Sequence, residues 1–296
     1  MSVVPASLRR VLYVSAALLI FVGLVGATYQ GVATAMERRQ YPRPGGLVAV
    51  ADHQLHIYCE GSGSPTVVLE APAAGVSGAW GSVQSRVAAT TRVCSYDRAG
   101  LGWSESSDRP YDPGRVPEEL RALLTGANEK GPFVVAGHGL GALFARMYAA
   151  MPNSEAAALV LIDAPTSGEG DDAIMRVMNV SPWLARAGVL RAGRILSSKA
   201  EPLDGPAGGV LRAFLNRPDH LARAAREIEK WDLTVRMATR AELKPTLPVI
   251  GVEASGADWV AFLTDPAEIE FAVRGIEDAV ARVRQHATRS DTSPLD

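Results

Sequence analysis

Cysteine is scarce in this sequence, and an excess of charge of either sign is absent. Cys59 and Cys94 are the two cysteines in 296 residues, which excludes zinc sites built from paired Cys-x-x-Cys motifs. The 30 lysines and arginines are balanced by 32 acidic residues, and the formal net charge is −2. A general nucleic-acid-binding protein carries a basic stripe along much of its length. We therefore expect no metal, no cofactor and no nucleic-acid partner.

A nucleophile is also missing, from the stretch FVVAGHGLGALFAR at Phe133–Arg146. Its apolar run, glycine-rich corner and Ala-rich end predict a strand, a sharp turn and a helix. A G-x-S-x-G motif in this setting is a nucleophile elbow, which exposes a serine hydroxyl above a sheet. Here the central residue is Gly139, between His138 and Leu140, and glycine has no side chain that can attack a carbonyl. An ordinary glycine turn is the alternative interpretation of this stretch in isolation.

The longest uniform stretch of the sequence is uncharged and apolar, and it runs from Val11 to Met36 after Arg9 and Arg10. As a helix it is long enough to cross a hydrocarbon core of about 30 Å. A cleaved signal peptide is the rival interpretation, because Ala33-Thr34-Ala35 fits the small-residue cleavage pattern. The run exceeds a usual signal-peptide core of about 7–15 residues, which favours an uncleaved transmembrane anchor. Glu37–Pro42 is predicted as a loop.

The anchor divides the chain into two parts. Residues 1–45 are the anchor and its linker. Residues 46–296 are expected to be one globular domain, because a chain of this size with 47% hydrophobic residues can bury a single large core. The arginines on the two sides of the apolar run are nearly balanced, so they leave its orientation open.

Within the globular part, strand and helix patterns alternate, which is typical of an α/β domain with a mostly parallel sheet flanked by helices. The predicted strands are two within Leu47–Cys59, then Thr66–Glu70, Arg92–Tyr96, Phe133–Ala136, Ala158–Asp163 and Leu247–Val252. The predicted helices are Glu118–Gly126, the segment up to Ala150, Pro182–Ile195, Val210–Leu215, Leu221–Met237 and Glu268–Arg284. Gly205–Gly209 is predicted as a flexible break, and His286 is placed in a solvated tail.

Four segments resemble, in order, the signatures of the membrane-anchored α/β-hydrolases: CEGSGSPTVVLEA, RVCSYDRAGLGWSE, GPFVVAGHGLGALFARMYA and AALVLIDAP. The usual family pattern has a YDRAG-x-G-x-S corner and a GHS-x-G elbow. The resemblance is close from Leu47 to Asp163 and looser beyond. It implies an α/β-hydrolase fold in which residues from about 165 to 246 form a helical cap over the pocket.

The same resemblance places the strand of Cys59 beside the strand of Cys94. A disulfide between them is then expected, because the N-terminus is of the secretory type and points to an oxidising compartment. Two free buried cysteines are the alternative. With the bridge, the globular domain is expected outside the cytoplasm, as part of a single-pass membrane protein.

Compared with the family pattern, the catalytic positions are degenerate. Gly139 replaces the serine, and Asp258 stands where a histidine would precede an aromatic residue. The usual acid position cannot be located, and the resemblance allows Asp163 as a substitute. One strand and its helix before the histidine loop are also missing. The expected ligand-binding frame consists of Pro72, Ala73, His138, Gly139 and Leu140.

Pro72 lies in the loop that supplies one oxyanion-hole donor in such enzymes, where the family commonly has glycine. Proline has a fixed φ and no N–H group. The donors that remain are the backbone N–H groups of Ala73 and Leu140, and the shape of the loop is expected to differ from that of an active enzyme.

The cap segment is rich in arginine. These arginines are predicted to lie on solvated helix faces. The other interpretation is that a basic cap rests on anionic lipid beside its own anchor, where each nearby cation contributes about 1 kcal/mol. The residues concerned are Arg186, Arg191, Arg194, Arg212, Arg217, Arg223, Arg226, Arg236 and Arg240.

Three functions are compatible with these features. The favoured one is a catalytically inactive, membrane-tethered hydrolase-fold protein that binds a small apolar ligand, a lipid or a protein partner. The alternative is an active esterase-like or lipase-like hydrolase with relocated catalytic residues, using His138 and Asp163. A purely structural envelope protein is the third.

Overall fold

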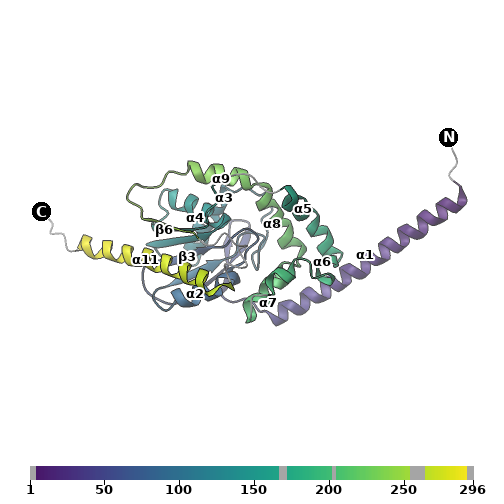
Figure 1. Cartoon of the computed structure of the whole chain (residues 1–296), viewed down its shortest axis with the longest axis horizontal. Helices are drawn as coiled ribbons and strands as arrows, with labels where there is room; N and C mark the ends of the chain where they lie inside the picture. Colours follow the sequence, from purple (N-terminus) through teal and green to yellow (C-terminus); the bar gives the residue numbers. More distant parts are fainter. Residues whose placement is uncertain (1–4, 167–171, 202–204, 254–263, 292–296) are drawn as a thin grey trace.

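A seven-stranded sheet forms the centre of the fold, in the strand order β1-β2-β4-β3-β5-β6-β7. The computed structural model describes residues 5–166, 172–201, 205–253 and 264–291 (Figure 1). β1 and β2 are antiparallel to each other and β2 is antiparallel to β4, whereas the other neighbouring strands are parallel. The strands are β1 Gly46–Val50, β2 His53–Glu60, β3 Thr66–Glu70, β4 Val93–Tyr96, β5 Phe133–His138, β6 Ala156–Ile162 and β7 Val249–Val252.

Helices cover both faces of this sheet, which explains why its central strands are apolar throughout. On β3, Val67 and Leu69 face the core cluster that contains residues of α2 (Gly81–Val87) and α11 (Pro266–Asp291). Val68, between them, faces the cluster that contains residues of α3 (Arg115–Gly126) and α4 (Leu140–Ala150). Alternate side chains along each strand therefore pack into two separate cores, one on each face of the sheet.

The cap lies between β6 and β7 in the sequence and is helical, as expected. Its last helix packs on α4 through Val235 and Ala238, and the other cap helices lie between the sheet and the N-terminal helix (Figure 1). The cap elements are α5 Asp172–Arg186, α6 Val189–Ala192, η2 Ser197–Ala200, α7 Gly205–Phe214, α8 Pro218–Glu229 and α9 Trp231–Arg240.

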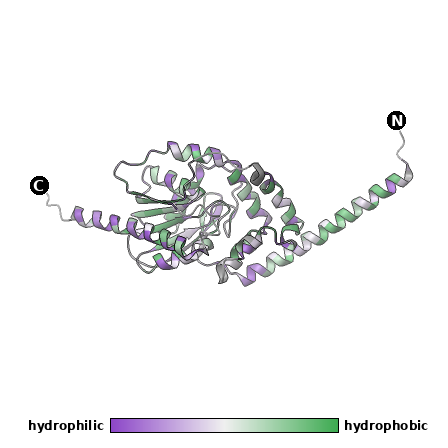
Figure 2. Ribbon diagram, in the orientation of Figure 1, coloured by the Kyte–Doolittle hydropathy of each residue, from purple (hydrophilic) through white to green (hydrophobic). Residues whose placement is uncertain are grey.

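The N-terminal helix α1 (Ala6–Gln40) projects from the domain and is predominantly apolar (Figures 1 and 2). Ser7–Gln40 is long and apolar enough to cross a membrane, and its most apolar window has a mean hydropathy of 2.3 with no burial. A membrane anchor and a signal sequence share these properties. The predicted loop at Glu37–Pro42 is wrong for its first four residues, because the helix continues through Gln40.

The sequence prediction placed the described strands within three residues of their observed ends, but several helical boundaries were wrong. The 3₁₀ helix η1 (Ser77–Trp80) and α2 were not predicted, α3 begins at Arg115, and α5 begins at Asp172. His286 lies within α11 rather than in a tail, although its side chain is exposed.

The predicted flexible break at Gly205–Gly209 is the start of helix α7. Proline is tolerated in the first turn of a helix, which accommodates the residue after Gly205. Gly209 is needed for packing rather than for flexibility, because a Cβ atom there would lie 2.4 Å from the ring of Tyr41. Gly209 therefore lets a cap helix approach the end of the linker.

Cys59 and Cys94 form a disulfide bond, as the resemblance implied. They lie directly opposite each other on β2 and β4, with a Cα–Cα distance of 4.0 Å. Glu129 lies near both sulfur atoms, but the bond leaves no thiolate for a metal ion.

We expect Cys59→Ser/Cys94→Ser to lower the free energy of unfolding by about 3–4 kcal/mol, because the bridge closes a loop with a sequence separation of 35 and limits the unfolded chain. Urea unfolding with and without dithiothreitol measures the loss. The double variant, as the control, should not respond to the reductant. Wild-type protein that is equally stable when reduced would contradict the prediction.

Candidate functional site

The corner between β5 and α4 has the conformation of a nucleophile elbow. Gly139, between His138 and Leu140, has φ 55° and ψ −122°, a combination that costs a non-glycine residue about 1–3 kcal/mol. Its N–H donates to the carbonyl of Ile162 at 2.9 Å. A Cβ atom built on Gly139 would have Cβ of Pro72, at 3.8 Å, as its nearest neighbour. The corner therefore has room for a side chain that the sequence does not provide.

The two glycines on either side of Gly139 are required at their positions for steric reasons. A Cβ at Gly137 would lie 2.3 Å from the carbonyl oxygen of Gly141, and one at Gly141 would lie 2.4 Å from that of Glu70. Both distances are far shorter than real Cβ contacts. These two glycines let the end of β5 and the start of α4 cross closely over the end of β3, so the elbow frame is maintained by packing.

The oxyanion loop, residues 70–75, follows β3 and lies beside the elbow. Pro72 is buried against the position of the missing side chain, and its carbonyl accepts a hydrogen bond from the N–H of Gly75 at 3.0 Å. Ala73 packs on the cluster that contains Leu140. Because Leu140 is the first residue of α4, its N–H is one of those that a helix leaves without an intrahelical acceptor. The fold thus brings the predicted frame together.

His138 and Asp163 also meet, at the adjacent ends of β5 and β6. Nε2 of His138 lies 3.5 Å from Oδ2 of Asp163. Desolvation lowers the pKa of His138, and the attraction of Asp163 opposes this shift only in part. The imidazole is therefore mainly neutral at pH 7. It has an acidic partner but, at Gly139, no hydroxyl group to deprotonate.

Asp258, the residue at the expected histidine position, lies outside the described residues, so its role stays a prediction. The described sheet ends at β7, and α11 is the next described helix. In the described part of the chain no further strand separates the cap from residue 254, in agreement with the predicted loss of one strand.

A serine, a histidine and an aspartate meet elsewhere in the domain, but their geometry is not that of a catalytic triad. Oγ of Ser77 and Oδ2 of Asp97 both contact the same nitrogen of His56, Nδ1, at 3.3 and 2.9 Å. Nε2 of His56 contacts the carbonyl of Pro44 at 2.6 Å. A triad histidine must contact its serine and its acid through different nitrogens. Asp97 instead accepts hydrogen bonds from the N–H groups of Ser77 and Trp103, which stabilises the corner after β4.

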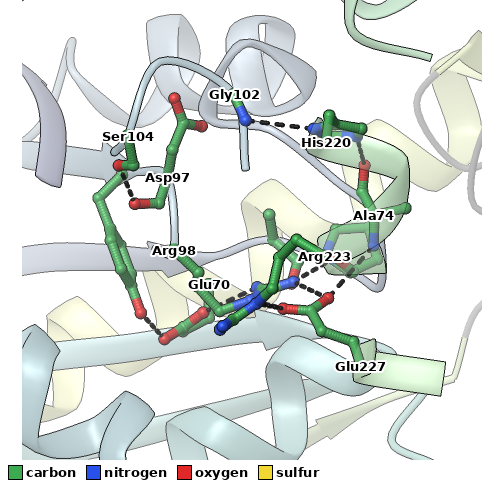
Figure 3. Close-up of polar contacts among 12 residues, drawn as sticks. Glu70, Ala74, Asp97, Arg98, Gly102, Ser104, His220, Arg223 and Glu227 are labelled. Atoms are coloured by element: carbon green, nitrogen blue, oxygen red, sulfur yellow. Dashed lines mark hydrogen bonds and ion pairs between the residues drawn. The ribbon is translucent and has the colours of Figure 1, made fainter. Parts of the chain in front are cut away.

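A buried charge cluster ties the oxyanion loop to the cap (Figure 3). Arg98, from the corner after β4, donates to the carbonyls of Ala71 and Pro72 at 2.6 and 2.8 Å. It also pairs with Glu70 at 3.2 Å and with Glu227 of α8 at 2.8 Å. All three charged side chains are at most 1% exposed. We call Glu70, Arg98 and Glu227 the buried charge cluster.

The two carboxyl groups of the cluster have different pKa values. Burial raises the pKa of Glu70 to about 7, although Arg98 and the hydroxyl of Tyr96 favour its ionised form. Burial also opposes ionisation of Glu227, but Arg98 and Arg223 outweigh it and lower its pKa. Glu227 is therefore the ionised partner of Arg98, and Glu70 is the group that takes up a proton near neutral pH.

His220 makes a second contact between the cap and the same loop (Figure 3). Its Nδ1 accepts a hydrogen bond from the N–H of Gly102 at 3.2 Å, and its Nε2 lies 3.0 Å from the carbonyl of Ala74. Because Nδ1 accepts a hydrogen bond and Nε2 faces a carbonyl oxygen, the proton of the neutral ring is on Nε2. Burial lowers the pKa of His220 to about 4, so the ring is neutral at pH 7.

Sequence reasoning missed the roles of Glu227 and His220. Arg98 belongs to the YDRAG corner that carried the family resemblance, but nothing local identified its partner, which is 129 residues away. The prediction of solvated arginines was right for five of the nine, which are exposed: Arg186, Arg194, Arg226, Arg236 and Arg240. The prediction was wrong for four others, which are partly buried in contacts within the protein: Arg191, Arg212, Arg217 and Arg223.

Comparison with known proteins agrees with this architecture. Residues 37–294 match the family model described as the alpha/beta hydrolase family, and the chain belongs to that family. Among solved structures, it is similar to the Cif epoxide hydrolase of Acinetobacter nosocomialis, with a TM-score of 0.62, 14% identity and coverage of 82% of this chain and 87% of that one. The N-formylmaleamic acid deformylase of Pseudomonas putida gives a TM-score of 0.56 and 24% identity, covering 78% and 88%. These identities establish the fold alone.

Curated relatives are similar over shorter stretches. An uncharacterised protein of Schizosaccharomyces pombe is 34% identical over 105 residues, which are 34% of this chain and 20% of the relative. An uncharacterised vacuolar membrane protein of Saccharomyces cerevisiae is 35% identical over 98 residues, 27% of this chain and 15% of the relative. The Bacillus subtilis protein YbdG is 27% identical over 161 residues, 52% and 48% of the two chains. The chain thus spans less than half the length of each of these relatives.

We expect Arg98→Met to lower the free energy of unfolding by about 3–5 kcal/mol, because it leaves Glu227 as a buried charge without its partner. Adding Glu227→Gln should restore part of the loss. Urea unfolding measures both effects. Arg86→Met is the control: Arg86 pairs with Glu270 while both side chains are more than 40% exposed, and its loss should cost less than about 1 kcal/mol. Equal losses in the two arginine variants would refute the prediction.

The second stability prediction concerns pH. The unfolded chain binds a proton at His220 below about pH 6.5, whereas the folded protein does so only below about pH 4. Stability from the neutral ring is therefore present above pH 6.5 and is lost as the pH falls towards 4, by about 3 kcal/mol. His220→Asn should remove this component from the pH dependence of unfolding. Gln285→Asn, at an exposed site on α11 that does not titrate, should leave it unchanged, and a His220→Asn profile that matches the wild type would contradict the assignment.

Proposed function

We propose that this protein is a membrane-tethered member of the α/β hydrolase family that has no serine-hydrolase activity and binds a small apolar ligand, a lipid or a protein partner at its degenerate site. One observation carries the proposal. The elbow keeps its backbone conformation at Gly139, with space for a side chain, but has no nucleophile. An intact elbow frame without the reacting group supports binding rather than turnover.

The surroundings of the elbow support the same conclusion. Pro72 takes one N–H group out of the oxyanion loop, and the carbonyls of Ala71 and Pro72 are fixed by Arg98. Arg98 and His220 also hold the cap on this loop. Two buried charges and a buried neutral histidine hold the junction between the cap and the oxyanion loop. This arrangement supports a site whose fixed shape matters for ligand binding.

The membrane tether is supported by α1, which is long and apolar enough to span a bilayer, and by the similarity to a vacuolar membrane protein. The disulfide between Cys59 and Cys94 supports an oxidising location outside the cytoplasm for the globular domain, because disulfides are rare in reducing compartments.

An active hydrolase with relocated residues is the second candidate. The distance of 3.5 Å between His138 and Asp163 favours it, because a histidine with an acidic partner is two thirds of a triad. It would need a nucleophile supplied from outside the elbow. A purely structural role, the third candidate, predicts that no ligand raises the melting temperature, whereas a ligand present at 100 times its Kd should add about 2.7 kcal/mol of stability.

We expect the purified protein to hydrolyse no short-chain aryl ester and to react with no serine-directed phosphonate probe. Gly139→Ser should remain inactive, because a serine without a general base stays protonated. Gly139→Ala is the matched control, since it introduces the same backbone strain without a hydroxyl. Addition of Asp258→His to Gly139→Ser is the change expected to recover traces of turnover.

Hydrolysis by the wild-type protein that is abolished by His138→Gln or Asp163→Asn would establish the second candidate instead. Activity in Gly139→Ser but not in Gly139→Ala would show that a general base is already in place. Either result would overturn the inactive site proposed above.

A further inference from the structure

The membrane helix α1 is docked on the cap through a close backbone contact. A Cβ atom at Gly26 would lie 2.0 Å from the carbonyl oxygen of Ala187. A Cβ at Gly188, which has φ 71°, would lie 3.0 Å from the carbonyl oxygen of Gly26 and 3.1 Å from the ring of Tyr29. Ala187 and Gly188 form the turn between α5 and α6. Glycine on both sides therefore lets α1 lie directly against this turn.

Polar contacts fix the same helix further along. Gln30 is only 5% exposed, and its amide donates to the carbonyl of Asn216 at 2.6 Å. Arg191 of α6 donates to Gln30 at 2.9 Å and to Glu37 at 3.1 Å. A buried amide and an ion pair with protein partners define the position of α1 relative to the cap. The cap cannot move away from the anchor without breaking them.

The docking point lies within the length of α1 that a bilayer would take up. A hydrocarbon core of about 30 Å needs about 20 helical residues. Counted from Val11, the first residue after Arg9 and Arg10, such a span ends near Gln30. Gly26 then lies about 6 Å inside the boundary, at a rise of about 1.5 Å per residue. The turn between α5 and α6 lies at the same depth, because it contacts Gly26.

Exposed apolar side chains precede this turn on α5 and follow it on α6. On α5, Val177, Val180 and Leu184 follow the i, i+3, i+7 spacing of one helix face, and they are 52%, 51% and 38% exposed. Trp183, 71% exposed, has the guanidinium of Arg186 over its ring at 5.2 Å. Figure 1 shows α5 and α6 beside α1, where that helix leaves the domain. We call Val177, Val180, Trp183, Leu184 and Val189 the apolar cap face.

We propose that the apolar cap face is immersed in the interface of the bilayer that α1 crosses, with Trp183 and Arg186 at headgroup level; this inference rests on the membrane tether proposed above. Amphipathic helices lie about 5–10 Å deep at this boundary, which agrees with the depth set by the Gly26 contact. Tryptophan and arginine at the polar edge are typical of membrane interfaces. The occupant of the face is thus lipid, and the cap faces the membrane.

Fluorescence quenching on the full-length protein in liposomes tests this arrangement. Val180→Cys and Leu184→Cys each provide a thiol for an environment-sensitive label, because the two native cysteines are bonded to each other. Lipids with spin labels near the headgroup should quench both labels several-fold more strongly than a label on Phe271→Cys. Phe271 is the matched control, being apolar and 56% exposed on α11, which packs on the sheet.

A label on Leu18→Cys separates this inference from the tether on which it rests. Leu18 is 60% exposed in the middle of the apolar part of α1, so spin labels deep in the acyl chains should quench it. If Leu18 is quenched but positions 180 and 184 are not, the tether stands and the apolar cap face is not in the membrane. If Leu18 itself is not quenched, the tether fails and the inference fails with it. Equal quenching at position 271 would show non-specific contact and would also overturn it.

Discussion

The buried guanidinium of Arg98 is the interaction on which the arrangement of the site depends. A charge that is 1% exposed is tolerated only with partners that replace its hydration. Here those partners are Glu70 at the end of β3, two carbonyls of the oxyanion loop and Glu227 of the cap. The end of β3 with its loop, the corner that carries Arg98 and the cap must therefore meet around one side chain, and this requirement fixes the cap over the elbow.

The backbone of the nucleophile elbow keeps its conformation without a serine nucleophile. Gly137 and Gly141 are required by close backbone packing, and neither contributes a reacting group. Gly139 adopts the strained conformation without steric cost, so the corner loses no stability with its nucleophile. The fold identifies the family of the chain, whereas activity depends on the particular groups at the site.

The fold was largely predictable because its central strands are short apolar runs between glycine-rich turns. Thr66–Glu70 was predicted with its observed bounds for this reason. Errors occurred where tertiary contacts decide the local structure. Glu37 continues a helix that was predicted to end before it, since it pairs with Arg191, and Gly209 is helical because it packs on Tyr41. Neither partner is near in sequence, so local propensity could not reveal them.

The sequence by itself determined the α/β class, the apolar N-terminal helix, the loss of the serine position at Gly139 and, through family resemblance, the pairing of Cys59 with Cys94. The first three follow from residue identity and from periodicity, which are local, whereas the cysteine pairing was implied only by the resemblance to the family. The tertiary structure alone decided that Arg98 joins Glu70 to Glu227, that His220 is neutral and buried, and that α1 lies on the cap at Gly26. Such contacts depend on burial and on distances between remote segments, and only the folded chain sets both.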